Sequence, residues 1–232
     1  MVKSTTKTIN KTAIFNRIMA EMDGQDDEFL KMPAYEELMQ DLVTAVCARL
    51  GRIPRTHVFY DDSPGAPTAW TDGNQTYANT GHGLIYGTNW EKHLCACGFQ
   101  THECGHVLFT DFVNLNSQKT GWAYGGLVDP RQKLNPTFDY SKLEAKLKDQ
   151  TFLEDVLAMQ NLMEDVYIEY MLKRVFDGVC KAGLIELRKH MYEDMPDMAE
   201  TMSWIGVSET KAGAFASLQQ VEALGFEIKG KD

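Results

Sequence analysis

The sequence has no apolar run near the roughly 20 residues that a membrane-spanning helix needs, so no spanning segment is predicted. The polar N-terminus, residues 1–11, is followed by no apolar stretch of the secretory type, which predicts a cytoplasmic protein. Cysteines are few and odd in number, five in 232 residues, which favours free thiols over a disulfide framework. Positive charge is also scarce: the formal net charge is -10, which argues against binding to nucleic acid or to anionic membranes.

What remains is a chain long enough to bury one substantial core, with 44% hydrophobic residues. Apolar residues at helical spacing predict a helix over 14–22 and a second helix from Pro33 to Leu50. A strand is expected over 57–60. A hairpin over 69–79 turns at Asp72-Gly73-Asn74, and a further strand is expected over 83–86.

A longer helix is expected to begin at Asn89, as its N-cap, and to run to Phe112 with an interruption near Gly98. Further predictions are a loop over 114–136 and helices over 140–176, 184–195 and 212–224. Strands are few and precede the long helix, so the predicted fold class is α+β, mostly helical with a small sheet. We divide the chain into an N-terminal helical segment packed on the core (1–54), a core (55–177) and a C-terminal helical segment (178–232).

The residues His102-Glu103-Cys104-Gly105-His106 match the pattern H-E-x-x-H. On a helix, residues four apart share a face, so the imidazoles of His102 and His106 can reach one metal ion. Zinc lowers the pKa of a water molecule that it binds, and Glu103 lies beside the first ligand, where it can take the proton as general base. The competing interpretation is a surface helix with two incidental histidines.

Two imidazoles and a water leave a catalytic zinc one protein ligand short. The best donor lies in the stretch NLMEDVYIE, residues 161–169, which carries three carboxylates within an apolar setting. A carboxylate that faces a core is costly unless it is paired or binds metal, so either Glu164 or Asp165 is predicted as third ligand. Glu169, one turn after Asp165, is predicted to orient a ligand histidine. A solvated acidic face is the alternative.

Three motifs together, Thr71-Asp72-Gly73, HECGH and NLMEDVYIE, resemble the zincin-like metallopeptidase domain of cobaltochelatase T subunit-like proteins and of related phage and bacterial proteins. The resemblance covers residues 55–175 and implies a zincin-like fold, with His102 and His106 as zinc ligands and Glu103 as catalytic base. It also implies a third ligand within Glu164-Asp165. Tyr167 stands where the family usually has arginine.

The expected function is therefore zinc-dependent hydrolysis of a peptide or protein substrate. The family's members are often paired with a von Willebrand A domain, which does not follow here, so such a partner is expected to be either missing or separately encoded. The alternative function is a catalytically silent zincin fold that binds an ATPase or a von Willebrand A partner. A bacterial or phage origin fits the resemblance, with the host cytoplasm as location in the phage case. A third alternative is a helical structural protein with an accidental motif.

Overall fold

The N-terminal part of the chain forms two helices, as predicted. The computed structural model describes residues 11–48, 51–113 and 149–194. Helix α1 (Lys11–Ala20) is followed by a short 3-10 helix, η1 (Glu28–Lys31), and by helix α2 (Pro33–Cys47). Pro33 opens α2 because its fixed φ angle suits the first helical position, where no backbone N–H is required.

Three strands form one small sheet: β1 (Arg55–Phe59), β2 (Ala69–Thr71) and β3 (Gln75–Asn79). Their order is β1-β3-β2, with β1 parallel and β2 antiparallel to β3. The predicted hairpin is therefore confirmed, and its turn uses Gly73 at φ 86°, a conformation that costs glycine little. Strand β2 lies at one edge of the sheet.

The prediction of a strand over 83–86 was wrong. The chain turns here instead, and Ile85 N–H donates to His82 C=O. The carbonyl of Leu84 accepts instead from the Cys95 thiol and from His190 Nδ1. Side chains of two helices thus satisfy a backbone group that a strand ladder would otherwise have used.

Helix α3 (Asn89–Phe109) is the long helix predicted to carry the motif, but its start was misassigned. The N-cap is Thr88, whose side chain and that of Glu91 form a capping box. Asn89 is the first helical residue, and its buried side chain accepts from Asp26 N–H and donates to Glu21 C=O. The amide therefore holds the segment that follows α1 rather than the start of α3.

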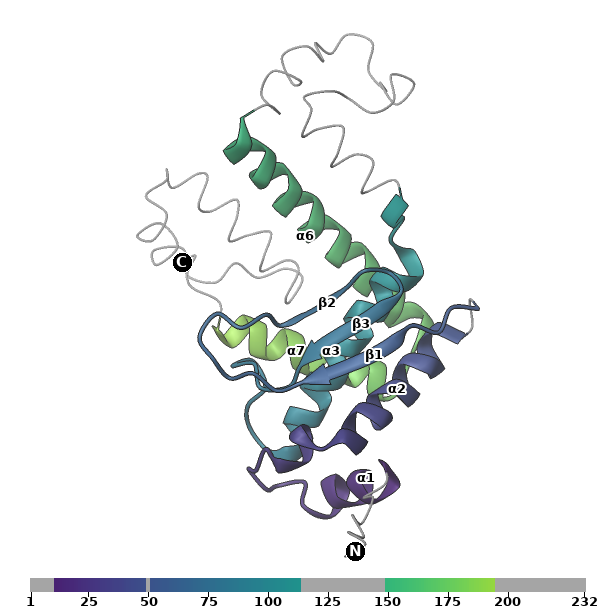
Figure 1. The fold of residues 1–232 in the computed structure, drawn as a ribbon, viewed down its shortest axis with the longest axis vertical. Helices are drawn as coiled ribbons and strands as arrows, with labels where there is room; N and C mark the ends of the chain where they lie inside the picture. The colour runs from purple at the N-terminus through teal and green to yellow at the C-terminus, as the bar shows by residue number, and fades with distance from the viewer. Residues whose placement is uncertain (1–10, 49–50, 114–148, 195–232) are drawn as a thin grey trace, which may run out of the picture.

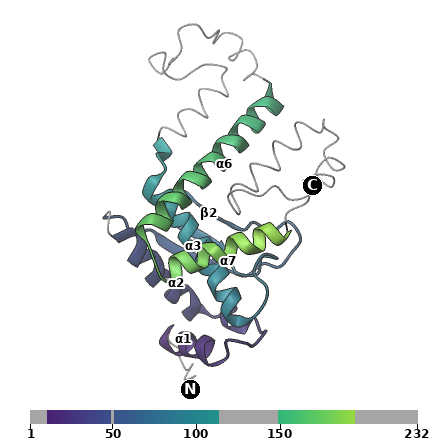
Figure 2. The ribbon, with the colours of Figure 1, turned by 180° about the vertical axis from the view of Figure 1, so that it is seen from behind.

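The prediction that the helix is interrupted near Gly98 was also wrong, because α3 runs without a break through this residue. Gly98 faces Gly183 of helix α7 (Val179–Asp194), and a side chain at Gly98 would collide with the backbone carbonyl of Gly183. The glycine thus permits close packing of two helices. Figures 1 and 2 show α3 between the sheet on one side and α7 on the other.

Helix α6 (Gln150–Val175) follows an N-cap at Asp149 and projects away from the sheet (Figure 1). It falls within the helical stretch expected over 140–176, and α7 begins before the helix expected over 184–195. The predicted loop at 114–136 and helix at 212–224 lie outside the described residues, as do residues 140–148.

Two groups of buried side chains hold these elements together. The larger joins α1, η1, α2, β3, α3 and α7, and the smaller joins α2, α3, α6 and α7. All five cysteines are free and buried, which agrees with the expectation of free thiols. The α+β class is thus confirmed, and among the described helices none is long and apolar enough to cross a membrane.

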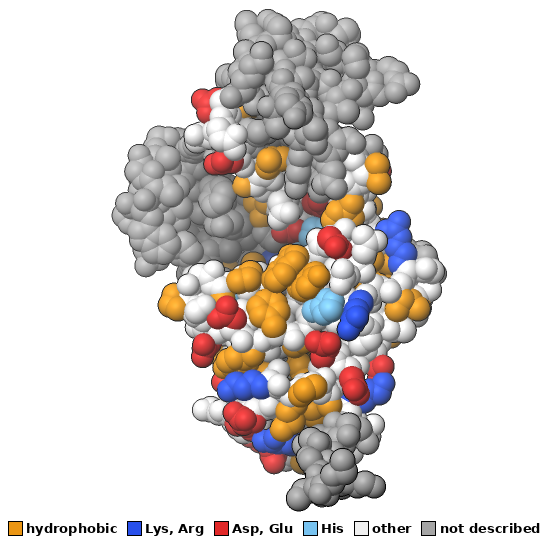
Figure 3. Space-filling model, viewed as in Figure 1, with side chains coloured by type: hydrophobic (Ala, Val, Ile, Leu, Met, Phe, Trp, Pro, Cys, Tyr) orange, Lys and Arg blue, Asp and Glu red, His pale blue; other side chains and the backbone are white. Residues whose placement is uncertain are grey.

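The face of the sheet turned away from α3 carries an aromatic row across all three strands. Trp70 stacks on Tyr77 with ring centroids 4.7 Å apart, and Tyr77 stacks on His57 at 4.9 Å. Figure 3 shows apolar side chains gathered on this face, with a histidine beside them. These cross-strand pairs stabilise a sheet whose strands are only three to five residues long.

Candidate metal centre

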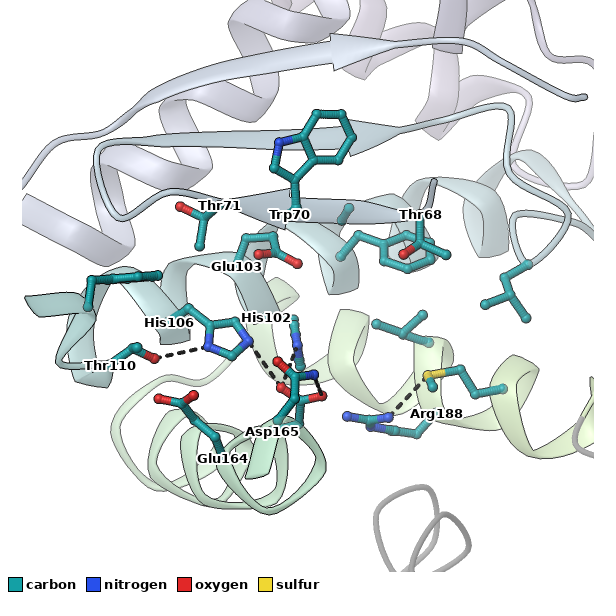
Figure 4. Close-up of a pocket in the computed structure, with 17 residues that line it drawn as sticks. Thr68, Trp70, Thr71, His102, Glu103, His106, Thr110, Glu164, Asp165 and Arg188 are labelled. Atoms are coloured by element: carbon teal, nitrogen blue, oxygen red, sulfur yellow. Dashed lines mark hydrogen bonds and ion pairs between the residues drawn. The ribbon is translucent and has the colours of Figure 1, made fainter. Parts of the chain in front are cut away.

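Helix α3 presents His102 and His106 on one face, as the spacing predicted, with ring centroids 5.0 Å apart. The helix ends directly after this turn, where Thr110 is the C-cap. Both imidazoles are largely buried and line a cavity of about 350 Å³ between α3, strand β2 and helix α6 (Figure 4).

Helix α6 brings Asp165 to these imidazoles across more than fifty residues of sequence. Asp165 Oδ1 lies 3.0 Å from His106 Nε2 and 3.5 Å from His102 Nε2. One ligand atom from each residue falls within 4.8 Å of the other two, and this is the one such group among the described residues. The two imidazoles and one carboxylate therefore converge on a single point.

Gly105, inside the motif, makes this approach of α6 possible. A Cβ atom at Gly105 would lie 2.7 Å from Leu172 Cδ1 and 3.2 Å from Ile168 Cβ. Ile168 and Leu172 are fully buried, and their packing against α3 fixes the rotation of α6 about its own axis. Because Asp165 lies one turn before Ile168, the same rotation turns its carboxylate towards the imidazoles.

Each of the three converging side chains has a further partner that orients it. His102 Nδ1 lies 2.9 Å from Glu169 Oε1, and His106 Nδ1 lies 3.0 Å from Thr110 Oγ1. Asn161 Nδ2 donates to Asp165 Oδ2 at 3.2 Å. A carboxylate such as that of Glu169 only accepts hydrogen bonds, so Nδ1 of His102 carries the hydrogen and Nε2 faces Asp165.

The residues fit a divalent cation. Asp165 Oδ1 is buried and has no aligned hydrogen-bond donor among the described residues, although two imidazole nitrogens lie close to it. A cation shared with both Nε2 atoms would give this buried oxygen a directed partner, which the two nearby imidazoles do not give it through an aligned hydrogen bond. Two imidazoles and one carboxylate are a common protein ligand set for catalytic zinc, which keeps a fourth position open.

Glu103 lies in the same cavity but does not join the converging atoms. Figure 4 shows its carboxylate between strand β2 and the two imidazoles. Burial raises the pKa of Glu103 above its ordinary value, while the nearby imidazoles oppose the shift. A carboxylate with a raised pKa is better suited to accept and release a proton near neutral pH.

Without metal, the cluster holds its charges as ion pairs. Burial by itself would lower the pKa of His102, but the carboxylates of Asp165 and Glu169 raise it to about 10. Burial would likewise raise the pKa of Glu169, yet His102 and Arg188 lower it to about 2. The two imidazoles hold the pKa of Asp165 well below its ordinary value. Metal binding at Nε2 must therefore displace a proton from His102.

These shifts predict the pH dependence of the metal-free protein. The pKa of His102 is about 10 in the fold against 6.5 ordinarily, so its contribution to stability is complete below about pH 6.5 and is lost as the pH rises towards 10. The pKa of Glu169 falls from 4.5 to about 2, so its contribution is present above about pH 4.5 and is lost on acidification. Chelator-treated protein should be most stable between about pH 4.5 and 6.5.

Thermal unfolding between pH 3 and pH 10 in the presence of chelator measures this dependence, since the bound proton is linked to folding. The variant His102→Gln is the control, and its midpoint should change less between about pH 6.5 and 10 than that of the wild type. A wild-type midpoint that rises through this alkaline range would contradict the ion-paired arrangement.

The sequence analysis predicted either Glu164 or Asp165 as the third ligand, and the structure places these two carboxylates differently. Asp165 joins the imidazoles, whereas Glu164 lines the cavity without entering the cluster. Glu169 lies against His102, where the sequence predicted an orienting carboxylate. Sequence reasoning missed Thr110, although it lies four residues after His106, and Asn161, four residues before Asp165. The same one-turn spacing would have found both.

Comparisons with protein-family models, with curated proteins and with solved structures found no match to this chain.

Proposed function

We propose that this protein is a zinc-dependent metallopeptidase with a zincin-like fold. The observation that carries the proposal is the convergence of His102, His106 and Asp165, which each offer one ligand atom within 4.8 Å of the other two, beside the carboxylate of Glu103. These atoms come from two helices and meet inside a cavity that admits a ligand. Two imidazoles, one carboxylate and an open position are a common arrangement at catalytic zinc sites, which is why this cluster supports zinc chemistry.

His102, His106 and Asp165 would hold the zinc ion, which when bound supplies a Lewis acid that activates water and polarises a carbonyl group. Glu103 accepts a proton from the attacking water and delivers it to the amine nitrogen as the C–N bond breaks. Its buried position holds the carboxylate near the reacting atoms, where bulk water does not compete for the proton.

A substrate peptide has a place to bind along strand β2. This strand is the edge of the sheet, and residues 68–71 line the cavity across from the motif helix. Figure 4 shows β2 above Glu103, with the imidazoles beneath it. An edge strand offers backbone groups to an extended peptide, which can add to the sheet as a further strand. That placement would bring a scissile bond over His102 and His106.

Metal analysis of protein purified without added zinc tests the proposal. We expect about one zinc ion per chain in the wild type and almost none in His102→Ala, because the loss of an imidazole leaves too few ligands. The matched control is His57→Ala, since His57 lies on the outer face of the sheet, and it should retain zinc. Recovery of iron in place of zinc, or of no metal after reconstitution, would overturn the assignment.

A further inference from the structure

A buried arginine contacts the carboxylate that orients one of the metal-centre histidines. Arg188 of α7 donates from Nε to Glu169 Oε2 at 2.8 Å, and its Nη2 donates to Glu169 Oε1. Both side chains are 4% exposed. The two parallel contacts form a fork that restrains both oxygens of the carboxylate and so fixes its plane.

The restrained carboxylate is the one that holds His102. Glu169 Oε1 accepts from His102 Nδ1 at 2.9 Å, and the same oxygen receives Nη2 of Arg188. The direction of the His102 ring, and with it the direction of Nε2, therefore depends on where Arg188 holds this oxygen. A chain of contacts thus runs from buried Arg188 on α7, through buried Glu169 on α6, to the largely buried His102 on the motif helix.

We propose that Arg188 is a positioning residue of the metal centre, which acts through Glu169 to aim His102 Nε2 at the ion. This inference rests on the proposed metal site. Arg188 is five residues from Gly183, where α7 packs closely on α3, so that the arginine enters the site from a rigid junction. The packing of α7 therefore fixes the geometry of ligands that α7 does not itself supply.

A second positively charged side chain, that of Lys173, also lies near Glu169 but is held differently from Arg188. Lys173 Nζ lies 3.4 Å from Glu169 Oε2, but the lysine side chain is 37% exposed and makes a single contact. An exposed ammonium on a flexible stem contributes charge without fixing an orientation. Removal of Lys173 and removal of Arg188 thus separate the effect of a nearby positive charge from that of the fork.

Zinc affinity, measured by competition with a chelator of known affinity, tests the proposal. Arg188→Met should bind zinc about 10- to 100-fold more weakly than the wild type, the usual range for loss of an orienting partner. Lys173→Met should remain within about threefold of the wild type because its contact is exposed. Arg188→Lys should fail to restore the affinity. Wild-type affinity in either Arg188 variant would overturn the positioning role.

A double-variant cycle shows whether Arg188 acts through Glu169. If it does, Arg188→Met should cause little further loss of zinc affinity in a Glu169→Ala background. Removing both partners leaves neither the guanidinium nor the carboxylate buried without the other, so this double variant should fold even where the single Arg188 variant is unstable. Additive losses would overturn the inference while the metal site stands. Absence of zinc from the wild type would overturn the metal site as well.

Discussion

Replacement of Glu103 by glutamine is expected to leave the zinc content unchanged and to reduce peptide cleavage by about 10²- to 10⁴-fold. The carboxylate is not among the converging ligand atoms, so its loss removes no metal ligand. Glutamine has nearly the same size but does not accept the proton of the attacking water. The measurement is kcat/KM on a peptide pool that the wild type cleaves, together with metal analysis of both proteins.

Glu164→Gln is the matched control for that experiment, because it makes the same chemical change at another carboxylate of the same cavity. It should retain zinc and most of the cleavage activity. Cleavage by Glu103→Gln at the wild-type rate would rule out Glu103 as general base. A wild type that holds zinc but cleaves no peptide would favour the alternative of a silent fold that binds an ATPase or a von Willebrand A partner.

The second large effect is expected at the third ligand. Asp165→Asn should weaken zinc binding by more than about 100-fold, beyond the loss that follows removal of an orienting partner. The oxygen of the neutral amide is a weaker ligand for the cation than a carboxylate oxygen. The variant also lacks the negative charge that balances the positive charge of the ion. The matched variant is again Glu164→Gln, whose carboxylate lies outside the cluster, and it should bind zinc as the wild type does.

Chelator competition and unfolding in denaturant should be measured together on both variants. Asp165→Asn is expected to fold, because the amide has nearly the same size as the carboxylate and its oxygen can still accept from Asn161 Nδ2. The reverse result, in which Glu164→Gln loses zinc and Asp165→Asn keeps it, would make Glu164 the ligand and would require a different rotation of α6.

Local sequence patterns predicted the elements well where one helix or one hairpin decides the outcome. The start of α2 at Pro33 and the hairpin around Gly73 follow from backbone preferences of single residues. The strand expected over 83–86 failed because the Leu84 carbonyl bonds to side chains from two distant helices. No local pattern contains those partners.

The sequence by itself determined which side chains share a helix face: His102 with His106 on α3, and Asp165 with Glu169 on α6. Helical periodicity alone makes residues four apart neighbours, wherever the helix lies. Only the tertiary structure decided that Asp165 rather than Glu164 meets the imidazoles, because the packing of Ile168 and Leu172 against Gly105 sets the rotation of α6. It alone also brought Arg188 to Glu169, since that contact depends on how closely α7 packs on α3.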